Sequence, residues 1–390
     1  MLATIAALTG ADEGFNHQIV NTFAAVGTAE RSWTEKVWFS MMRKDGSLQV
    51  NFGLGKYANR NVMDGFAGVQ RGNRQRTVRA SRVLAANADE MEVGPLRYEI
   101  IEPFRQLKVT LAQNHAQPIR FELVFHDRMP AFFENRDTVI ANGRTASDVI
   151  RYHQPGTVSG WVEMEGERIA VEADNWFAFR DHSWGIREHV GIDPPDLVPG
   201  HAGATGANKA GSTFHFNWLV SQIERPDGSF YDLAYYFRDF GGDGRPDFFS
   251  GYINESDGRQ IPVLQLHPEI TYRRGDKAAL HGRIHAVIGG AGLATEQRVF
   301  EMEAIDPNMG FRLLPGMYGA WKGQIHGSYK GDEFLDGECI DDVNNPEKTA
   351  ENYRWQIRDR PVRIRESDNH GFGDMESIIL GDYPGVSFAD

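Results

Sequence analysis

Short segments in which polar and apolar residues alternate recur along the chain, and turn sequences containing Gly or Pro separate them. Alternation with a period of two is typical of a β-strand that buries one face. Turn sequences that favour hairpins join several neighbouring segments, namely Asp45-Gly46, Glu165-Gly166 and Pro226-Asp227-Gly228. The pattern therefore predicts an all-β, mostly antiparallel protein.

Helical periodicity is rare along the same chain. The best candidates for helices are Thr145 to Tyr152 and a short piece near Pro346 to Tyr353. The sequence therefore predicts few helices, all of them short.

A segment rich in Pro, Gly and Ala, residues 191–212, interrupts the strand pattern. It is poor in large apolar residues, so it cannot build a core and is predicted to be a linker. The chain is thereby divided into an N-terminal β-domain, residues 15–190, and a C-terminal β-domain, residues 213–388. We expect two tandem antiparallel barrels, since closing a sheet removes its exposed edges and a barrel of about eight strands can hold one small ligand.

Composition and charge narrow the class of partner. The net charge of −13 disfavours a nucleic-acid-binding protein, which would need a basic face. The arginine-rich residues 71–82 are a local exception, which we interpret as a solvated loop entering a strand, with an anion-binding patch as the alternative. The single cysteine, Cys339, excludes an intrachain disulfide and a zinc site with two thiolates.

The apolar runs of the chain are all short. They fall well below the roughly 18 residues that a membrane-spanning helix needs, so no integral membrane segment is predicted. The first residues lack the basic start and apolar core of a secretory signal. We therefore expect a cytoplasmic protein.

The segment NWFAFRDHSWGIR, residues 175–187, places several ionisable groups beside a large aromatic ring. In a strand, His182 and Trp184 share one face, whereas Asp181 and Arg187 share the other. Histidine suits proton transfer, and an indole provides a dry wall that can stabilise a cation. Asp181 could reach His182 only across a bulge, for which Gly185 would be suited.

A structural interpretation of this segment competes with the catalytic one. Asp181 could pair with Arg187 or Arg180, and His182 could bond a main-chain carbonyl, so that the segment closes one end of a barrel. Buried charges must be paired in either case, so pairing alone does not decide between the two interpretations.

Residues of the C-terminal half could supply partners for His182. Alternation places His215 and Asn217 on one strand face, and Tyr236 with Arg238 on a face of the next strand, so these four are candidates for substrate binding. Tyr318, Trp321 and His326 could line the second barrel, although packing would explain them equally well.

No metal or cofactor site is predicted. His281 and His285 share a strand face but lie too far apart to hold one ion. The chain also lacks a Gly-x-Gly-x-x-Gly turn, a Walker loop and a Gly-x-Ser-x-Gly elbow.

Residues 180–187, RDHSWGIR, resemble the Arg-Asp-His-Ser-Trp-Gly-x-Arg signature of the AttH-like and carotenoid 1,2-hydratase-like proteins, a lipocalin-like superfamily. Residues 94–111 and 152–173 are similar to the strands that precede this signature. The resemblance implies two tandem lipocalin-like domains with a pocket near their junction. For the hydratase branch it also implies cofactor-free proton chemistry on an apolar substrate, with His182, Trp184 and Asp181 at the signature positions.

These observations favour a cofactor-independent lyase, either a hydratase or dehydratase, an isomerase or a carbon–carbon lyase. It would act by acid–base proton transfer on a hydrophobic terpenoid or aromatic small molecule, with His182, Asp181, Trp184 and Arg187 as catalytic residues. The alternative is a non-catalytic lipocalin-like carrier of a hydrophobic ligand, and an interaction module is a third hypothesis. Association into a homodimer is left open.

Overall fold

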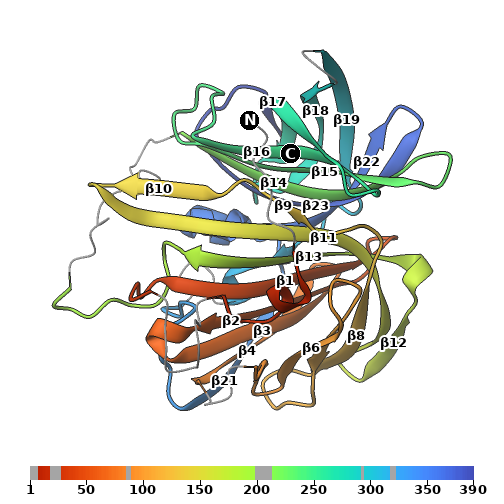
Figure 1. Ribbon diagram of the computed structural model, residues 1–390. Coiled ribbons are helices and arrows are strands. Elements are labelled where there is room, and N and C mark those ends of the chain that lie inside the picture. Colours follow the sequence, from red (N-terminus) through yellow and green to blue (C-terminus); the bar gives the residue numbers. More distant parts are fainter. Residues whose placement is uncertain (1–7, 18–27, 85–88, 198–212, 291–293, 317–321) are drawn as a thin grey trace.

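The computed structural model of the protein describes residues 8–17, 28–84, 89–197, 213–290, 294–316 and 322–390. In these residues the chain forms two β-sheets that lie against each other (Figure 1). The predicted all-β fold with few short helices is confirmed, with one closed barrel and one curled half-barrel where two barrels were expected. The two sheets differ in closure, because one is a closed barrel and the other is curled but open.

The first sheet contains most of the strands of the N-terminal half. Its strands are β1 (Trp33–Arg43), β2 (Gln49–Tyr57), β3 (Val62–Arg71), β4 (Arg74–Val83), β5 (Glu92–Val93), β6 (Leu96–Glu102), β7 (Gln106–Leu111), β8 (Ile119–Asp127), β9 (Phe132–Phe133), β10 (Asp137–Ala141), β11 (Arg144–Met164), β12 (Glu167–Val171), β13 (Trp176–Ile186) and β21 (Glu333–Ile340). The strand order is β21-β4-β3-β2-β1-β13-β11-β8-β7-β6-β5, and β9, β10 and β12 also pair with β11. This sheet is therefore a curled half-barrel.

The second sheet is a closed barrel. Its strands are β14 (Phe214–Glu224), β15 (Phe230–Asp239), β16 (Phe248–Glu255), β17 (Gln260–Arg273), β18 (Ala279–Gly289), β19 (Thr295–Ala304), β22 (Arg358–Glu366) and β23 (Asn369–Leu380), with β20 (Phe311–Arg312) beside β22 and β24 (Val386–Ala389) parallel to β17. The barrel closes because β14 pairs with β23 and β16 pairs with β17.

The helical elements of the described residues are short. They are η1 (Gly10–Glu13), η2 (Ala58–Arg60), η3 (Ala173–Asn175), η5 (Leu314–Gly316), η6 (Tyr353–Gln356) and α1 (Pro346–Glu351). The helix predicted near residues 346–353 is confirmed by α1, whose N-terminus is capped by the side chain of Asn345.

The helix predicted over residues 145–152 is wrong, because these residues belong to β11. They are hydrogen-bonded to β10 on one side and to β13 on the other. Pairing on both edges therefore outweighs a helical spacing that extends over only about two turns.

The three predicted turns connect antiparallel neighbours, namely β1 with β2, β11 with β12, and β14 with β15. The division into residues 15–190, 191–212 and 213–388 stays a prediction, and residues 198–212 of the linker lie outside the described part of the chain. Strand β21 belongs to the C-terminal range in sequence but is hydrogen-bonded to β4 of the first sheet. Strand β21 thus links the C-terminal part of the chain to the first sheet.

Three apolar clusters account for most of the buried surface. One fills the half-barrel, one fills the closed barrel, and the third lies between the two sheets. The third cluster combines side chains of β1 and β13, such as Trp38 and Phe179, with side chains of β14, such as Phe216 and Trp218. Both faces of β1, β13 and β14 are consequently buried. Among the described residues, no helix has the length and apolar character required to span a membrane.

Candidate functional site

A cavity of about 180 Å³ lies between the two sheets. We call it the inter-sheet cleft and define it by its lining residues, which come from β1, β11 and β13 on one side, from β14, β15 and β23 on the other, and from Arg187 just beyond β13: Lys36, Trp38, Arg151, Asp181, Ser183, Arg187, Phe216, Trp218, Tyr236 and Glu376. It adjoins a second cavity of about 690 Å³, with which it shares four of these residues. Together the two spaces suit a small organic molecule, for which pockets of roughly 300–1,000 Å³ are usual.

Two tryptophans form an aromatic wall of the cleft. The rings of Trp38 and Trp218 meet edge to face, with centroids 5.4 Å apart. Trp38 Nε1 donates to Asp359 Oδ2 at 3.1 Å, and Trp218 Nε1 donates to Glu134 Oε1 at 3.1 Å. Because both indole N–H groups already have acceptors, the rings can offer a ligand an apolar surface.

Arg151 supplies a fixed positive charge in the cleft. Its Nη1 atom lies 3.1 Å from Glu134 Oε2, and its Nε atom lies 3.2 Å from Asp181 Oδ2. Burial opposes the charge of this guanidinium, but Glu134 and Asp181 raise its pKa above the ordinary value. Arg151 therefore stays charged and forms an ion pair with Asp181.

Lys36 and His326 form a second buried pair. Lys36 Nζ donates to His326 Nδ1 at 3.0 Å, while His326 Nε2 donates to the carbonyl of His189 at 2.9 Å. Burial, reinforced by the nearby charge of Arg187, lowers the pKa of Lys36 to about 7. Burial also lowers the pKa of His326 well below its usual range, so this imidazole is neutral and accepts the hydrogen bond from Lys36.

Glu376 is the carboxyl group that the closed barrel contributes to the cleft. Burial raises its pKa to about 7, and burial likewise raises the pKa values of its neighbours Asp359 and Asp374 well above the ordinary range. The side-chain amide of Asn51 on β2 donates a hydrogen bond to Asp359 Oδ2. Because its pKa is about 7, Glu376 can carry a proton near neutral pH. Its side chain is only half-buried and lines the cleft, so a ligand there can reach it.

Some of the predicted site residues meet at the cleft. Asp181, Arg187 and Tyr236 line it directly, and Arg238 lines the adjoining cavity, where its Nη1 atom lies 2.8 Å from Asp137 Oδ2. Arg187 Nη2 donates to Ser183 Oγ at 2.5 Å. The structure therefore brings residues of β13 and β15 together, as expected for a site shared by the two halves.

His182 and Trp184 lie on the opposite face of β13, with ring centroids 5.6 Å apart. His182 is fully buried, and its Nε2 and Nδ1 atoms lie 3.1 Å from Glu35 Oε1 and from the hydroxyl of Tyr152. The register of β13 with both neighbouring strands is uninterrupted, so no bulge turns Asp181 toward His182. The catalytic role of His182 and Trp184 stays a prediction, but it cannot involve direct contact with Asp181.

Gly185 has a packing role in this strand. Its φ is +130°, and a Cβ atom placed there would collide with the carbonyl oxygen of Asp148. Glycine is therefore required for the close approach of β13 to β11.

His215 and Asn217 point into the closed barrel, away from the cleft. His215 Nε2 lies 3.1 Å from the hydroxyl of Tyr272, and Asn217 accepts a hydrogen bond from the hydroxyl of Tyr235. Burial lowers the pKa of His215 to about 3, so this imidazole is neutral. The predicted substrate-binding role of these two residues also stays a prediction, and Tyr318 and Trp321 lie outside the described residues.

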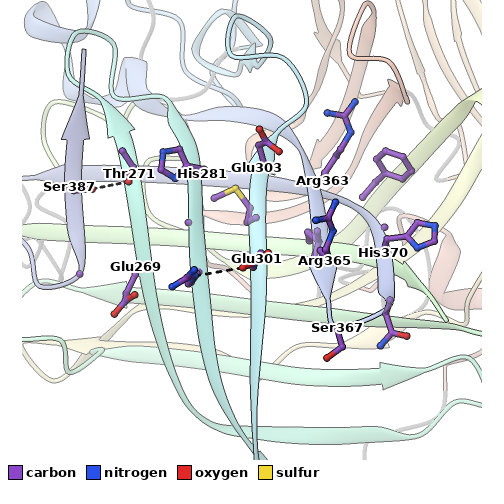
Figure 2. Close-up of a pocket in the computed structure, with 18 of the residues that line it drawn as sticks. Glu269, Thr271, His281, Glu301, Glu303, Arg363, Arg365, Ser367, His370 and Ser387 are labelled. Carbon is purple, nitrogen blue, oxygen red and sulfur yellow. Dashed lines mark hydrogen bonds and ion pairs between the residues drawn. The ribbon is translucent and has the colours of Figure 1, made fainter. Parts of the chain in front are cut away.

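A separate hollow of about 1110 Å³ lies on the outside of the closed barrel, over β17, β18, β19 and β22 (Figure 2). Its charged side chains, of both signs, are largely exposed and pair with one another, as Arg283 does with Glu301 at 3.8 Å. Such pairs in water contribute little, so the inter-sheet cleft is the better candidate.

Sequence reasoning missed several residues of the cleft. Lys36, Arg151 and Glu376 each stand in an ordinary alternating strand, and no motif marks any of them. The only available signal was that each is a charged residue with a large apolar side chain beside it on the same strand face, such as Trp38 beside Lys36 and Ile378 beside Glu376.

Comparisons with known proteins give fold-level likenesses. The structure resembles the crystal structure of kievitone hydratase from Nectria haematococca with 12% sequence identity and a TM-score of 0.46, covering 94% of this chain and 95% of that chain. It resembles the crystal structure of CghA with 10% identity and a TM-score of 0.46, covering 90% and 89%, and that of CghA with Sch210972 with 10% identity and a TM-score of 0.45, covering 92% and 90%. A search of curated protein sequences gives no match. A family model matches residues 8–389, and the chain therefore belongs to that family, a family of unknown function (DUF8625).

Proposed function

We propose that the protein is a lyase of the hydro-lyase type, which adds water to or removes water from an apolar aromatic or terpenoid molecule bound in the inter-sheet cleft. The observation that carries the proposal is the placement of two carboxyl groups, Asp181 and Glu376, on opposing sheets around one aromatic-walled cavity. The resemblance of residues 180–187 to the signature of hydratase-like proteins supports the same reaction class.

The two carboxyl groups differ in environment. Burial raises the pKa of both groups, to about 7 for Glu376, and at Asp181 the guanidinium groups of Arg151, 3.2 Å away, and of Arg187 oppose this rise. Two carboxyl groups with different surroundings can serve as base and acid at one pH. In the dehydration direction, Asp181 removes a C–H proton, the C–O bond breaks, and the proton of Glu376 leaves with the oxygen as water.

The cations of the cleft stabilise the charge that develops in this step. As the C–H proton leaves, negative charge builds up on the substrate, and Arg151 and Arg187 lie on the same wall as Asp181. Fixed positive groups in a site with little water lower the energy of such a state without reorganising. The apolar walls formed by Trp38, Phe216 and Trp218 would favour a hydrophobic substrate.

The test is to incubate the purified chain with a panel of apolar alcohols, alkenes and aromatic compounds and to follow the mass of each. We expect at least one compound to gain or lose the mass of one water molecule. If a compound binds tightly and no mass in a broad panel changes, the proposal is wrong and the protein is a carrier. A change in the intrinsic tryptophan fluorescence, absent in Trp218→Phe, would report binding in either case, since Trp218 lines the cleft.

A further inference from the structure

Three side chains from separate parts of the chain lie close together on the face of the half-barrel opposite to the cleft. They are His17 from the N-terminal segment, Glu35 from β1 and His182 from β13. One ligand atom of each residue lies within 4.8 Å of those of the other two. Glu35 Oε1 contacts both His17 Nδ1 and His182 Nε2. His182 is fully buried, and the side chains of Glu35 and His17 are 3% and 16% exposed.

The second nitrogen of each imidazole is held by an oxygen atom. His17 Nε2 lies 3.2 Å from Asp12 Oδ1, and His182 Nδ1 lies 3.1 Å from the hydroxyl of Tyr152. An imidazole that binds a metal through one nitrogen usually donates the N–H of the other to such an oxygen. The outer contacts therefore direct the lone pairs of His17 Nδ1 and His182 Nε2 toward Glu35.

The hydroxyl proton of Tyr152 has a second acceptor, the carbonyl of Asp12 at 3.3 Å. When Tyr152 donates to this carbonyl, His182 must carry its own proton on Nδ1 and present Nε2 without one. Two lone-pair nitrogens and a carboxylate that face one another repel, unless a proton or a metal ion lies between them. The competing arrangement is a network without a metal, in which Tyr152 donates to His182 Nδ1, His182 Nε2 donates to Glu35, and a protonated His17 donates to Asp12 and Glu35.

The donor set has the composition of a known class of metal site. Two imidazole nitrogens and one carboxylate oxygen suit zinc, at bond lengths of roughly 2.0–2.2 Å, with a fourth position for water. Tetrahedral bonds of about 2.1 Å place ligand atoms about 3.4 Å apart, and His182 Nε2 and Glu35 Oε1 are 3.1 Å apart. His17 Nδ1 contacts the same oxygen more closely, so the imidazole of His17 must move back to admit an ion. Trp184 stacks on His17 with ring centroids 3.7 Å apart and covers the cluster from one side.

We propose that His17, Glu35 and His182 bind one divalent transition-metal ion, with zinc as the preferred ion. The ion fastens the N-terminal segment to β1 and β13. Glu35 and Lys36, like His182 and Asp181, leave opposite faces of their strands, so the ion lies behind the wall of the cleft rather than in it. The proposal is independent of the proposed lyase activity.

Metal content of the full chain tests this proposal. The chain is prepared without a histidine tag and with Cys339→Ser, which removes the exposed thiolate as an adventitious ligand. It is stripped with a chelator, reconstituted with zinc, desalted and measured by elemental analysis. We expect about one zinc per chain, and about one tenth of that or less in His17→Gln. The matched control is His285→Gln, which removes an exposed histidine on β18 and is expected to keep the full zinc content.

Two further readouts separate a bound metal from a hydrogen-bonded network. Cobalt(II) in place of zinc should give visible absorption bands of four-coordinate intensity in the Cys339→Ser chain and not in His17→Gln. Zinc should raise the midpoint of thermal unfolding of the Cys339→Ser chain and of His285→Gln, but not that of His17→Gln, since only a ligand of the folded state stabilises it. A reconstituted chain that retains less than one tenth of an equivalent of zinc, or equal retention in His17→Gln, overturns the proposal and leaves the protonated His17 network.

Discussion

Replacing Arg180 with methionine is expected to lower the free energy of unfolding by about 3–5 kcal/mol, which is the usual cost of leaving one member of a buried ion pair alone. Arg180 and Glu13 are both fully buried, and Nη2 of the arginine lies 2.5 Å from Oε1 of the glutamate. The same guanidinium donates to Gln154 Oε1 from Nε and Nη2, at 2.9 and 2.6 Å. Urea unfolding with linear extrapolation measures the loss.

The matched control for this variant is an exposed pair of the same type. Arg120 lies 2.7 Å from Glu163, but the side chain of Arg120 is 39% exposed, so Arg120→Met should change the free energy of unfolding far less than Arg180→Met does. The double variant Glu13→Gln, Arg180→Met should lose less than the sum of the two single variants, because neither charge is then left unpaired. An Arg180→Met chain as stable as Arg120→Met would contradict the interpretation.

This ion pair explains part of the signature in residues 180–187. Arg180 holds Glu13 of the N-terminal segment, while Gly185 permits the close approach of β11. Both are structural contributions, in line with the structural interpretation of this segment, although the partner of Arg180 is Glu13 and not Asp181. Asp181, one position further along the strand, lines the cleft instead. A single strand can therefore hold the fold together on one face and line a cleft on the other.

Much of the fold follows from local patterns. The turns at Asp45-Gly46 and Pro226-Asp227-Gly228 join neighbouring antiparallel strands, because turn chemistry and strand alternation act over a few residues. The prediction of a helix at residues 145–152 is wrong because a local pattern carries no information about distant partners. The strand β13 that pairs with this part of β11 lies about 35 residues away in sequence. The open edge of the half-barrel and the pairing of β21 with β4 depend on such distant contacts as well.

The candidate site was less accessible from the sequence. Alternation correctly predicted that His182 and Trp184 share a face and that Asp181 leaves the other. It could not tell which face of β14 meets the first sheet. The apolar side chains Phe216 and Trp218 line the cleft there, whereas the polar His215 and Asn217 are hydrogen-bonded to tyrosines inside the barrel. Hydrogen bonds to buried tyrosines reverse the usual relation between polarity and exposure.

Glu376→Gln is expected to lower the turnover of a substrate found in the mass-change experiment by about 10²- to 10⁴-fold, the usual contribution of a general acid or base. Glutamine keeps the shape of the side chain and a hydrogen-bond donor but cannot deliver a proton to the leaving oxygen. Glu303→Gln is the matched control, because Glu303 is exposed on β19 and should leave turnover unchanged. Turnover within twofold of the wild type would remove Glu376 from the proposed mechanism.

The same variant changes how stability depends on pH. Burial raises the pKa of Glu376 from an ordinary value of 4.5 to about 7, with Asp359, Arg151, Asp181 and Glu134 as the other charged groups that act on it. Between pH 4.5 and about pH 7 the folded chain therefore binds more protons than the unfolded chain. The stability that protonated Glu376 contributes is fully present below pH 4.5 and is lost as the pH rises through about 7.

Between about pH 5 and pH 7, the free energy of unfolding of the wild type should therefore fall relative to that of Glu376→Gln by about 1.4 kcal/mol per pH unit. Above about pH 8 the two plots of free energy against pH should run parallel. Urea unfolding of both chains across this range measures the difference without any substrate. Parallel profiles over the whole range would mean that Glu376 is ionised in the folded protein at neutral pH, and it could not then act as the acid of the cleft.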